Sequence, residues 1–204
     1  RPKETCAQIM ARKGWPSRVA RFCCSVLKEY KVLDYAVVGV RRDESRARSE
    51  RYKEPEVCRV YNKTKGIKSR QYLPILDWTA ADVEAFIMER GIKCHSLYYD
   101  EDGTFHVERR LGCMGCPLAS KKQRMAEFKA HPQMAKFYIK GAQRFLDTHP
   151  DSKIHGYFKD AYEWFAFSLY CDNLEEFRYM FGVNMFGESI DCKQHLQELF
   201  GIDL

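Results

Sequence analysis

The last third of the chain places apolar and polar residues at the spacing of amphipathic helices. This pattern predicts a series of helices without an internal repeat, over residues 120–130, 132–147, 159–170, 174–181 and 190–200. Ser120 stands at the capping position of the first of them, and Pro132 at the start of the second, where proline is favoured. The region after residue 118 is therefore predicted to be helical.

Residues 17–30 carry a narrower apolar stripe, with apolar side chains at positions i, i+3 and i+4. The stripe predicts an amphipathic helix with Cys23 on its buried face. Cys24 follows about 100° further round the helix, at the edge of that face.

The middle of the chain reads differently. Residues 34–40 are a short apolar run of β-forming residues, typical of a strand buried on both faces of a parallel sheet. Residues 42–70 are polar and Arg-rich without a regular period over most of their length, which predicts a long functional loop. A second strand is predicted over 71–76 and a helix over 80–90. The fold class predicted for residues 1–118 is α/β, as part of a doubly wound parallel sheet, with a helical region over 119–204.

The composition limits the class of protein, its compartment and its partners. The 204 residues are 45% hydrophobic, enough for one sizeable core, and no run approaches the roughly 18 apolar residues of a membrane helix. Nine irregularly spaced cysteines do not resemble a disulfide framework, which favours a reducing cytoplasm. The net charge of +6 favours anionic partners, either nucleotides or nucleic acid.

The cysteines form the most specific pattern in the chain. An adjacent pair, Cys23 and Cys24, is followed by the tight pair Cys113 and Cys116. Four thiolates from two distant segments predict a metal centre, either a 4Fe-4S cluster or a structural zinc. Adjacent cysteines favour the cluster, because one zinc ion is more easily reached by cysteines with residues between them. If Cys24 is not a ligand, Cys58 is the first substitute.

Other residues that could carry chemistry have simpler interpretations. Cys6, Cys94 and Cys171 are predicted to be packing residues, and Trp78 to cover the core. The six histidines form no spacing typical of a metalloenzyme. As hypotheses, three arginines could offset the charge of a thiolate cluster or contact substrate: Arg21, Arg109 and Arg110.

An Arg-rich turn follows the first predicted strand, with the sequence Gly39-Val-Arg41-Arg42-Asp-Glu44-Ser45-Arg46-Ala-Arg48. Ligands of open α/β sheets bind beyond the carboxyl ends of strands, where this turn would lie. Guanidinium groups match phosphate and sulfate oxygens bidentately. The alternative is a solvated basic loop, because charge runs usually face water.

Four motifs in this order resemble the phosphoadenosine phosphosulfate reductase family of adenine nucleotide alpha-hydrolase-like proteins. The resemblance covers roughly residues 15–120 and is carried by Cys23-Cys24-x-x-x-Lys28, the Arg41 turn, Arg70-x-x-x-Pro74-Ile-x-Asp77-Trp78-Thr79-x-x-Asp82-Val83, and Gly112-Cys113-x-Gly-Cys116-Pro117. The resemblance implies a 4Fe-4S centre on the four cysteines, near the substrate. It also implies that an adenylyl substrate is held by Arg41, Arg42, Glu44, Ser45, Arg48 and Arg70.

The sequence departs from that family in three ways. The phosphate-binding Ser-Gly-Gly-x-Asp-Ser loop is absent from this sequence. Either the chain is the C-terminal portion of a longer protein, which we expect, or the ancestral site has been lost. The Glu-Cys-Gly-x-His tail of sulfonucleotide reductases is replaced by Phe200-Gly-Ile-Asp-Leu204. The long helical region resembles members such as the sulfur-transfer proteins of DNA phosphorothioation.

Two classes of function therefore stay open. The first is an enzyme of sulfur metabolism that binds an adenine nucleotide or sulfonucleotide and carries out sulfonucleotide reduction or sulfur transfer. Its partners would include a thiol electron donor such as thioredoxin, or DNA. The second is a non-enzymatic domain that is stapled by a metal and binds nucleic acid or another protein.

Overall fold

The computed structural model describes residues 2–29, 31–62, 66–109, 111–183 and 185–203. The predicted α/β class is confirmed, with helices and one three-stranded sheet. The described chain forms two compact units, one made of residues 31–111 and the other of residues 1–30 together with 112–204. This division differs from the predicted boundary at residue 118, because the first 30 residues belong with the C-terminal helices. We call the two parts the sheet unit and the helical unit.

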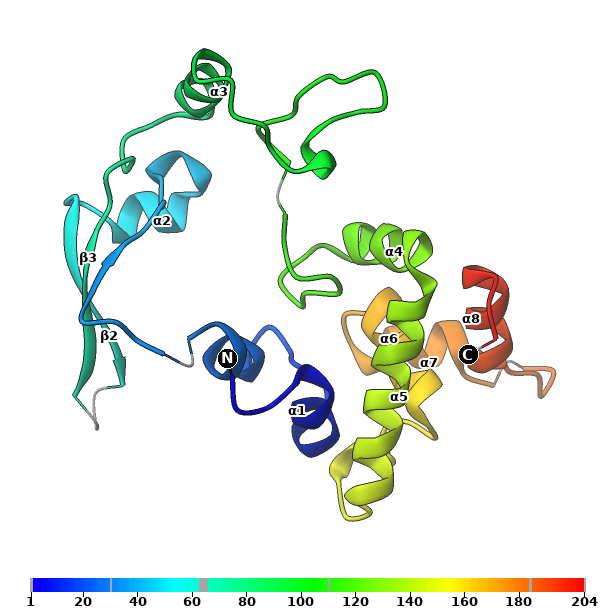
Figure 1. The fold of residues 1–204 in the computed structure, drawn as a ribbon. Helices are drawn as coiled ribbons and strands as arrows, with labels where there is room; N and C mark the ends of the chain where they lie inside the picture. Colours follow the sequence, from blue (N-terminus) through cyan, green and yellow to red (C-terminus); the bar gives the residue numbers. More distant parts are fainter. Residues whose placement is uncertain (1, 30, 63–65, 110, 184, 204) are drawn as a thin grey trace. The chain divides into compact units, whose positions relative to one another are not determined.

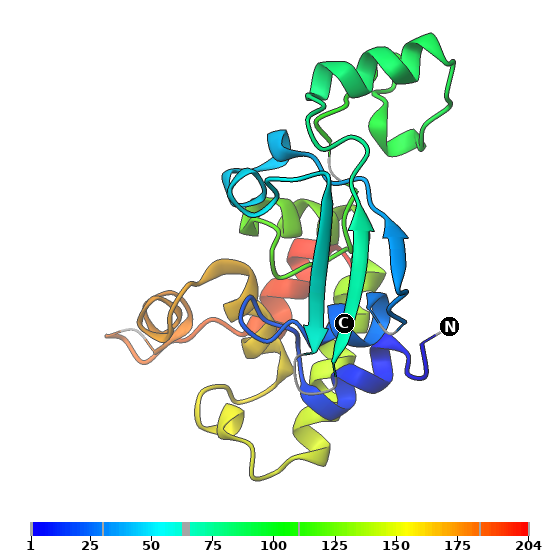
Figure 2. The same ribbon diagram turned by 90° about the vertical axis from the view of Figure 1, so that its left-hand side faces the viewer.

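The sheet unit is built on a mixed sheet in which β3 lies between the other two strands (Figure 2). The strands are β1 (Tyr35–Val37), β2 (Glu56–Asn62) and β3 (Ile67–Tyr72). β1 runs parallel to β3, with Tyr35 opposite Arg70, whereas β2 runs antiparallel to it as the other arm of a hairpin. The small core beside the sheet contains Tyr52, Leu73 and Leu76.

Three sequence predictions for this unit were wrong. The expected loop over residues 42–70 contains β2 and most of β3. The expected strand over 71–76 begins earlier, and residues 73–76 form a turn that ends in the core. β1 is not buried on both faces, because Tyr35 and Val37 are 70% and 75% exposed at the edge of the sheet.

The hairpin escaped the sequence pattern because its buried positions are polar. Ser69 and Gln71 alternate inward on β3 and are 2% and 4% exposed. The Gln71 amide donates to the Tyr61 hydroxyl at 3.0 Å, which offsets the cost of burying it. A strand whose inward side chains are polar shows no apolar alternation.

Two helices complete the sheet unit, together with short 3-10 turns. The elements are η2 (Arg42–Glu44), α2 (Arg46–Arg51), α3 (Ala80–Glu89) and η3 (Ser96–Tyr98). The predicted helix over 80–90 is confirmed, with a capping box between Thr79 and Asp82. Trp78 is half-buried just before it and packs edge-on against Phe86.

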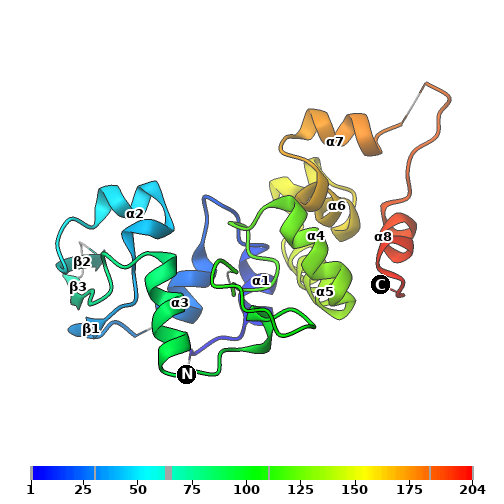
Figure 3. The ribbon, with the colours of Figure 1, turned by 90° about the horizontal axis from the view of Figure 1, so that it is seen from above.

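The helical unit holds the larger core. Its C-terminal helices match the predictions closely, although two of them begin two residues later than expected, and a 3-10 turn, η4 (Lys153–Gly156), joins the second and third. They are α4 (Lys121–Ala130), α5 (Pro132–Thr148), α6 (Ala161–Tyr170), α7 (Leu174–Phe181) and α8 (Cys192–Phe200). Figure 3 shows α4, α5 and α6 side by side, and α8 packs against α6. Phe165 is 1% exposed at the centre of this core.

The first 30 residues differ from their predicted structure. A helix that was not predicted, α1 (Cys6–Lys13), packs against α5 and buries Ile9 and Met10 (Figure 1). The predicted helix over 17–30 is largely wrong: residues 17–20 are irregular, and the helical part is a short π-turn, η1 (Cys24–Lys28), preceded by Phe22 and Cys23. Val19, expected on the buried stripe, is 96% exposed. Tyr30 lies outside the described residues.

Throughout the described parts of both units, no helix is long and apolar enough to span a membrane.

Candidate functional site

The loop that carries Cys113 and Cys116 is held against the core of the helical unit. Its turn is closed by a backbone hydrogen bond from Cys116 to the Cys113 carbonyl at 3.1 Å. The Tyr138 hydroxyl on α5 donates to the Met114 carbonyl at 2.8 Å. The Gly115 amide donates to the Glu127 carboxylate on α4 at 2.8 Å. Side chains of two helices therefore fix the direction of the loop.

Gly115 is required by this packing. Its φ is +67°, in the left-handed region that L side chains avoid. A Cβ there would stand 2.7 Å from the Phe128 ring and 2.9 Å from the Tyr138 ring. Glycine thus lets the backbone between the two cysteines approach both aromatic rings.

The π-turn carries the other pair of cysteines and a lysine that reaches the loop. Hydrogen bonding and charge interaction with Cys113 raise the pKa of Lys28, with smaller contributions from Cys24 and Cys116. Burial, followed by the neighbouring Cys24 thiol, raises the pKa of Cys23 to about 11, and Cys116 adds to the shift. π-turns often occur at functional sites. The structure therefore brings all four predicted ligands into one neighbourhood, around the Lys28 ammonium.

Two further side chains, those of Cys6 and Tyr138, lie near these four cysteines. We define the thiol group as Cys6, Cys23, Cys24, Cys113 and Cys116. Cys6 on α1 was predicted to be a packing residue, but its pKa is raised by burial and by the nearby Cys113. The pKa of Tyr138 is raised by burial and by four of the thiols. Neither residue carries a signal in the sequence, because the fold of α1 against α5 brings them to the loop. Cys6 is thus a fifth thiol within the group.

The thiol group has the donors of a metal site without the geometry of a single-ion site. Among the residues that the structure describes, no three His, Cys, Asp or Glu side chains are close enough together to hold one ion. A tetrahedral zinc needs four sulfurs at about 2.3 Å from one centre. An iron–sulfur cluster is held by thiolates on separate iron atoms, and cysteine is its usual ligand. The thiols are therefore donors of the kind that both centres use, and among the described residues they do not form a single-ion site.

In the sheet unit, the Arg-rich turn follows β1 at its carboxyl end, as predicted. Several of its side chains have structural partners. The Arg42 guanidinium donates to the Tyr52 carbonyl at 2.9 Å, and also bonds the Lys53 carbonyl and Asp77. Arg48 pairs with Glu44, and the Ser45 hydroxyl caps α2. These contacts hold the turn in place.

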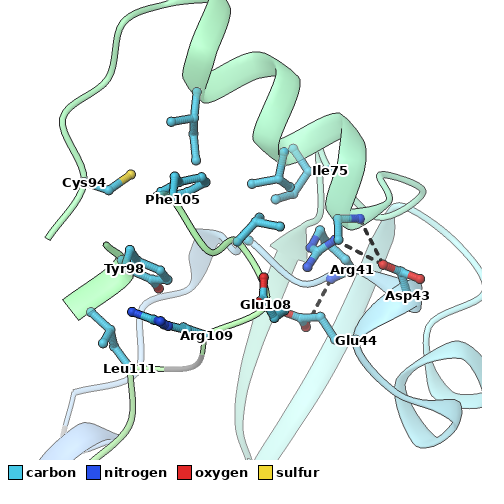
Figure 4. A pocket seen from close by; sticks show the side chains of 15 residues that line it. Arg41, Asp43, Glu44, Ile75, Cys94, Tyr98, Phe105, Glu108, Arg109 and Leu111 are labelled. Atoms are coloured by element: carbon cyan, nitrogen blue, oxygen red, sulfur yellow. Dashed lines mark hydrogen bonds and ion pairs between the residues drawn. The ribbon is translucent and has the colours of Figure 1, made fainter. Parts of the chain in front are cut away.

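Of the arginines in the turn, Arg41 lines a cavity. Its guanidinium lies 3.4 Å from the Asp43 carboxylate, which also accepts from the Ala80 amide at the start of α3 at 3.0 Å. The cavity, of about 600 Å³, is shown in Figure 4. It lies within the sheet unit and is lined by Gly39, Arg41, Asp43, Glu44, Ile75, Ala80, Val83, Ile87, Cys94, Tyr98, Phe105, Val107, Glu108, Arg109 and Leu111.

The lining of this cavity is mixed. α3 and the segment around Phe105 supply an apolar wall, and two arginines stand against three carboxylates. Arg109 donates to the Tyr99 carbonyl at 3.1 Å and pairs with Asp100. His106 lies between Asp100 and Glu108, at 2.7 and 2.9 Å, and these hydrogen bonds raise its pKa. Asp43 lies within the predicted turn but was not singled out there, and Glu108 and the apolar wall join it only through the fold.

The remaining candidate residues have other surroundings. Arg70 on β3 lies 3.5 Å from Glu56 and stacks over the Tyr35 ring at 5.7 Å. Cys58 is exposed on β2, and Cys94 lines the sheet-unit cavity. Arg21 is exposed beside the π-turn. Arg110, the third arginine of the hypothesis on cluster charge, lies outside the described residues.

Comparison with known proteins agrees with the cysteine and arginine motifs. The family model of the phosphoadenosine phosphosulfate reductase domain matches residues 1–119. The chain belongs to this family. Members of this reductase family have the adenine nucleotide alpha-hydrolase fold, and the family suggests a nucleotide substrate. The resemblance drawn from the motifs is confirmed at this level.

Two curated relatives are similar to this reductase-family chain. An uncharacterized 37.8 kDa protein in the gpa 5′ region of Escherichia phage 186 is 35% identical over 134 residues, which are 59% of this chain and 36% of the relative. An uncharacterized protein of Methanocaldococcus jannaschii is 28% identical over 149 residues, or 68% of this chain and 33% of the relative. The chain thus spans about a third of the length of these relatives. No solved structure matches it.

Proposed function

We propose that this chain carries the iron–sulfur centre and part of the nucleotide site of a sulfur-metabolism enzyme that performs sulfonucleotide reduction or sulfur transfer. The observation that supports the proposal best is the thiol group. Cysteines separated by 88 residues or more in sequence gather around one ammonium within a single compact unit. A buried cysteine that only fills space in a core needs no neighbouring ammonium group.

The protein's own groups prepare the thiols for a cluster. Thiols must lose their protons to bind metal, and burial, together with the neighbouring thiols, opposes this loss at Cys23 and Cys6. The Lys28 side chain hydrogen-bonds to Cys113 and places a positive charge beside the loop. The hydrogen bonds that hold the loop to Tyr138 and Glu127 are made by the backbone of Met114 and Gly115, so they do not use the two thiols. A bound cluster would supply redox-active or anion-attracting iron.

Purification without oxygen tests this part of the proposal. We expect the intact chain to absorb broadly near 400 nm and to contain about four iron and four sulfide ions per chain, as a 4Fe-4S cluster requires. Metal analysis and sulfide assay measure both. A colourless protein with one equivalent of zinc would overturn the cluster and support a structural zinc site.

The sheet-unit cavity supports the nucleotide part. Its apolar wall suits a base, and its carboxylates can accept hydrogen bonds from ribose hydroxyls. Arg41 is the side chain from the predicted turn whose guanidinium reaches the cavity without being bonded to backbone carbonyls. We assign it to the phosphate or sulfate group of the ligand.

Replacing Arg41 with glutamine should weaken binding of adenosine 5′-phosphosulfate or ATP by at least about tenfold, the effect of one charge-assisted hydrogen bond. Isothermal titration calorimetry measures the affinity. Arg46→Gln is the matched control, because Arg46 lies in the same turn, is 92% exposed and pairs with Glu50 at its own helix face. Equal losses in both variants would show that general charge, rather than Arg41, attracts the ligand.

A further inference from the structure

A second cavity, of about 490 Å³, lies within the helical unit, between the chain before the π-turn and the helices α4 and α6. Its lining carries an excess of positive charge. Lys13, Arg18, Lys121 and Arg124 line it, and Asp172 is the carboxylate among its lining residues. Asp172 is already paired with Lys121 at 2.8 Å. The lining of the cavity therefore holds four cations and one carboxylate.

Arg124 is the most informative of these cations. Its Nε is buried and has no hydrogen-bond partner among the described residues. Burial lowers the pKa of Arg124, and the neighbouring Arg18 lowers it further. A buried N–H group without an acceptor costs free energy that a bound anion would recover. Two arginines that face the same space are the usual way to hold a phosphate or sulfate group.

Part of the lining of the cavity is aromatic. Trp15 and Trp164 lie with their ring centroids 4.8 Å apart, and both line the cavity together with Phe145 and Phe167. The Trp15 indole donates to the Tyr138 carbonyl at 3.0 Å, which fixes the orientation of its ring. Gly14 has φ of +72°, and a Cβ added there would stand 2.8 Å from the Trp164 ring. The rings are therefore held rigidly, as a stacking surface requires.

We propose that this cavity binds a small anion that carries a phosphate or sulfate group and a flat aromatic ring, such as a nucleoside monophosphate. The anionic group lies against Arg18 and Arg124, and the ring lies against Trp15 and Trp164. The Arg18 guanidinium also donates to the Pro117 carbonyl at 3.1 Å, directly after Cys116. The site is therefore linked to the cysteine loop, and its lining shares no residue with the cavity at Arg41.

Tryptophan fluorescence can report on this site alone. The chain has three tryptophans, and Trp78 belongs to the sheet unit, so Trp78→Phe leaves both remaining indoles at the cavity. Adenosine 5′-monophosphate should quench the fluorescence of this variant saturably. Adenosine, inorganic phosphate and inorganic sulfate should each bind at least about tenfold more weakly, because each makes only part of the contacts. Competition by phosphate against sulfate distinguishes the preferred anion.

In the same background, Arg124→Gln and the exposed Arg18→Gln should each weaken binding by about tenfold or more. Arg178→Gln, an equal charge change at an exposed position on α7, should leave the affinity unchanged. Arg41→Gln should also leave it unchanged, which separates this site from the proposed nucleotide site. Circular dichroism shows whether each variant folds, and Arg18→Gln decides the test if Arg124→Gln does not. The proposal is overturned if quenching does not saturate, if phosphate binds as tightly as the nucleotide, or if Arg178→Gln causes the same loss.

Discussion

Replacing Gly115 with alanine should lower the free energy of unfolding of the helical unit by about 2–5 kcal/mol, since the left-handed backbone costs roughly 1–2 kcal/mol and overpacking roughly 1–3 kcal/mol. The new methyl group would stand under 3.0 Å from the rings of Phe128 and Tyr138. Phe128 is 2% exposed and cannot move without disturbing the core. The alternative response, a shift of the loop, would break the bond from Tyr138 to the Met114 carbonyl.

Urea denaturation followed by circular dichroism measures this effect. Gly201→Ala is the matched control, because Gly201 has φ of +63° in the same unit but no atom within 4 Å of the added Cβ. It should lose only the backbone part, about 1–2 kcal/mol. If both variants are destabilised equally, the aromatic rings do not constrain the loop, and its fixed direction has another cause.

The helices after residue 118 could be predicted because their signals are local. Ser120, Pro132 and Asn173 stand at the first turns where capping or a fixed φ favours a helix start. An apolar stripe then continues through each helix. By contrast, the hairpin of β2 and β3 places Ser69 and Gln71 in its interior, so the sequence shows no alternation there.

Some residues of the candidate sites could be predicted from the sequence, and others could not. The motifs identified the cysteine loop and the Arg41 turn, because short spacings survive in the sequence whatever the fold does. They could not separate Arg41 from Arg42, since only the fold shows that Arg42 bonds the carbonyls of Tyr52 and Lys53. Cys6 and Tyr138 reach the thiol group through the packing of α1 on α5, which local patterns do not encode.

Serine substitutions in the thiol group should have the largest effect on the proposed metal centre. We expect Cys113→Ser and Cys116→Ser to reduce the iron content of anaerobically purified protein to less than about a tenth, because a serine hydroxyl is a poor substitute for a thiolate ligand. Cys23→Ser should behave in the same way, since its thiol interacts with both Cys24 and Cys116. Iron analysis and absorption near 400 nm measure the loss.

The fourth ligand is decided by comparing Cys24→Ser with Cys6→Ser. Cys24 lies on the π-turn and contributes to the raised pKa of Lys28. Cys6 lies on α1, and Cys113 contributes to its raised pKa. We expect Cys24→Ser to lose the iron and Cys6→Ser to keep it, because a π-turn directs adjacent side chains differently from a regular helix. Cys58→Ser is the control, as an exposed thiol on β2 of the sheet unit. Iron lost with Cys6 would move the cluster toward α1, and iron lost with Cys58 would contradict a centre built within the helical unit.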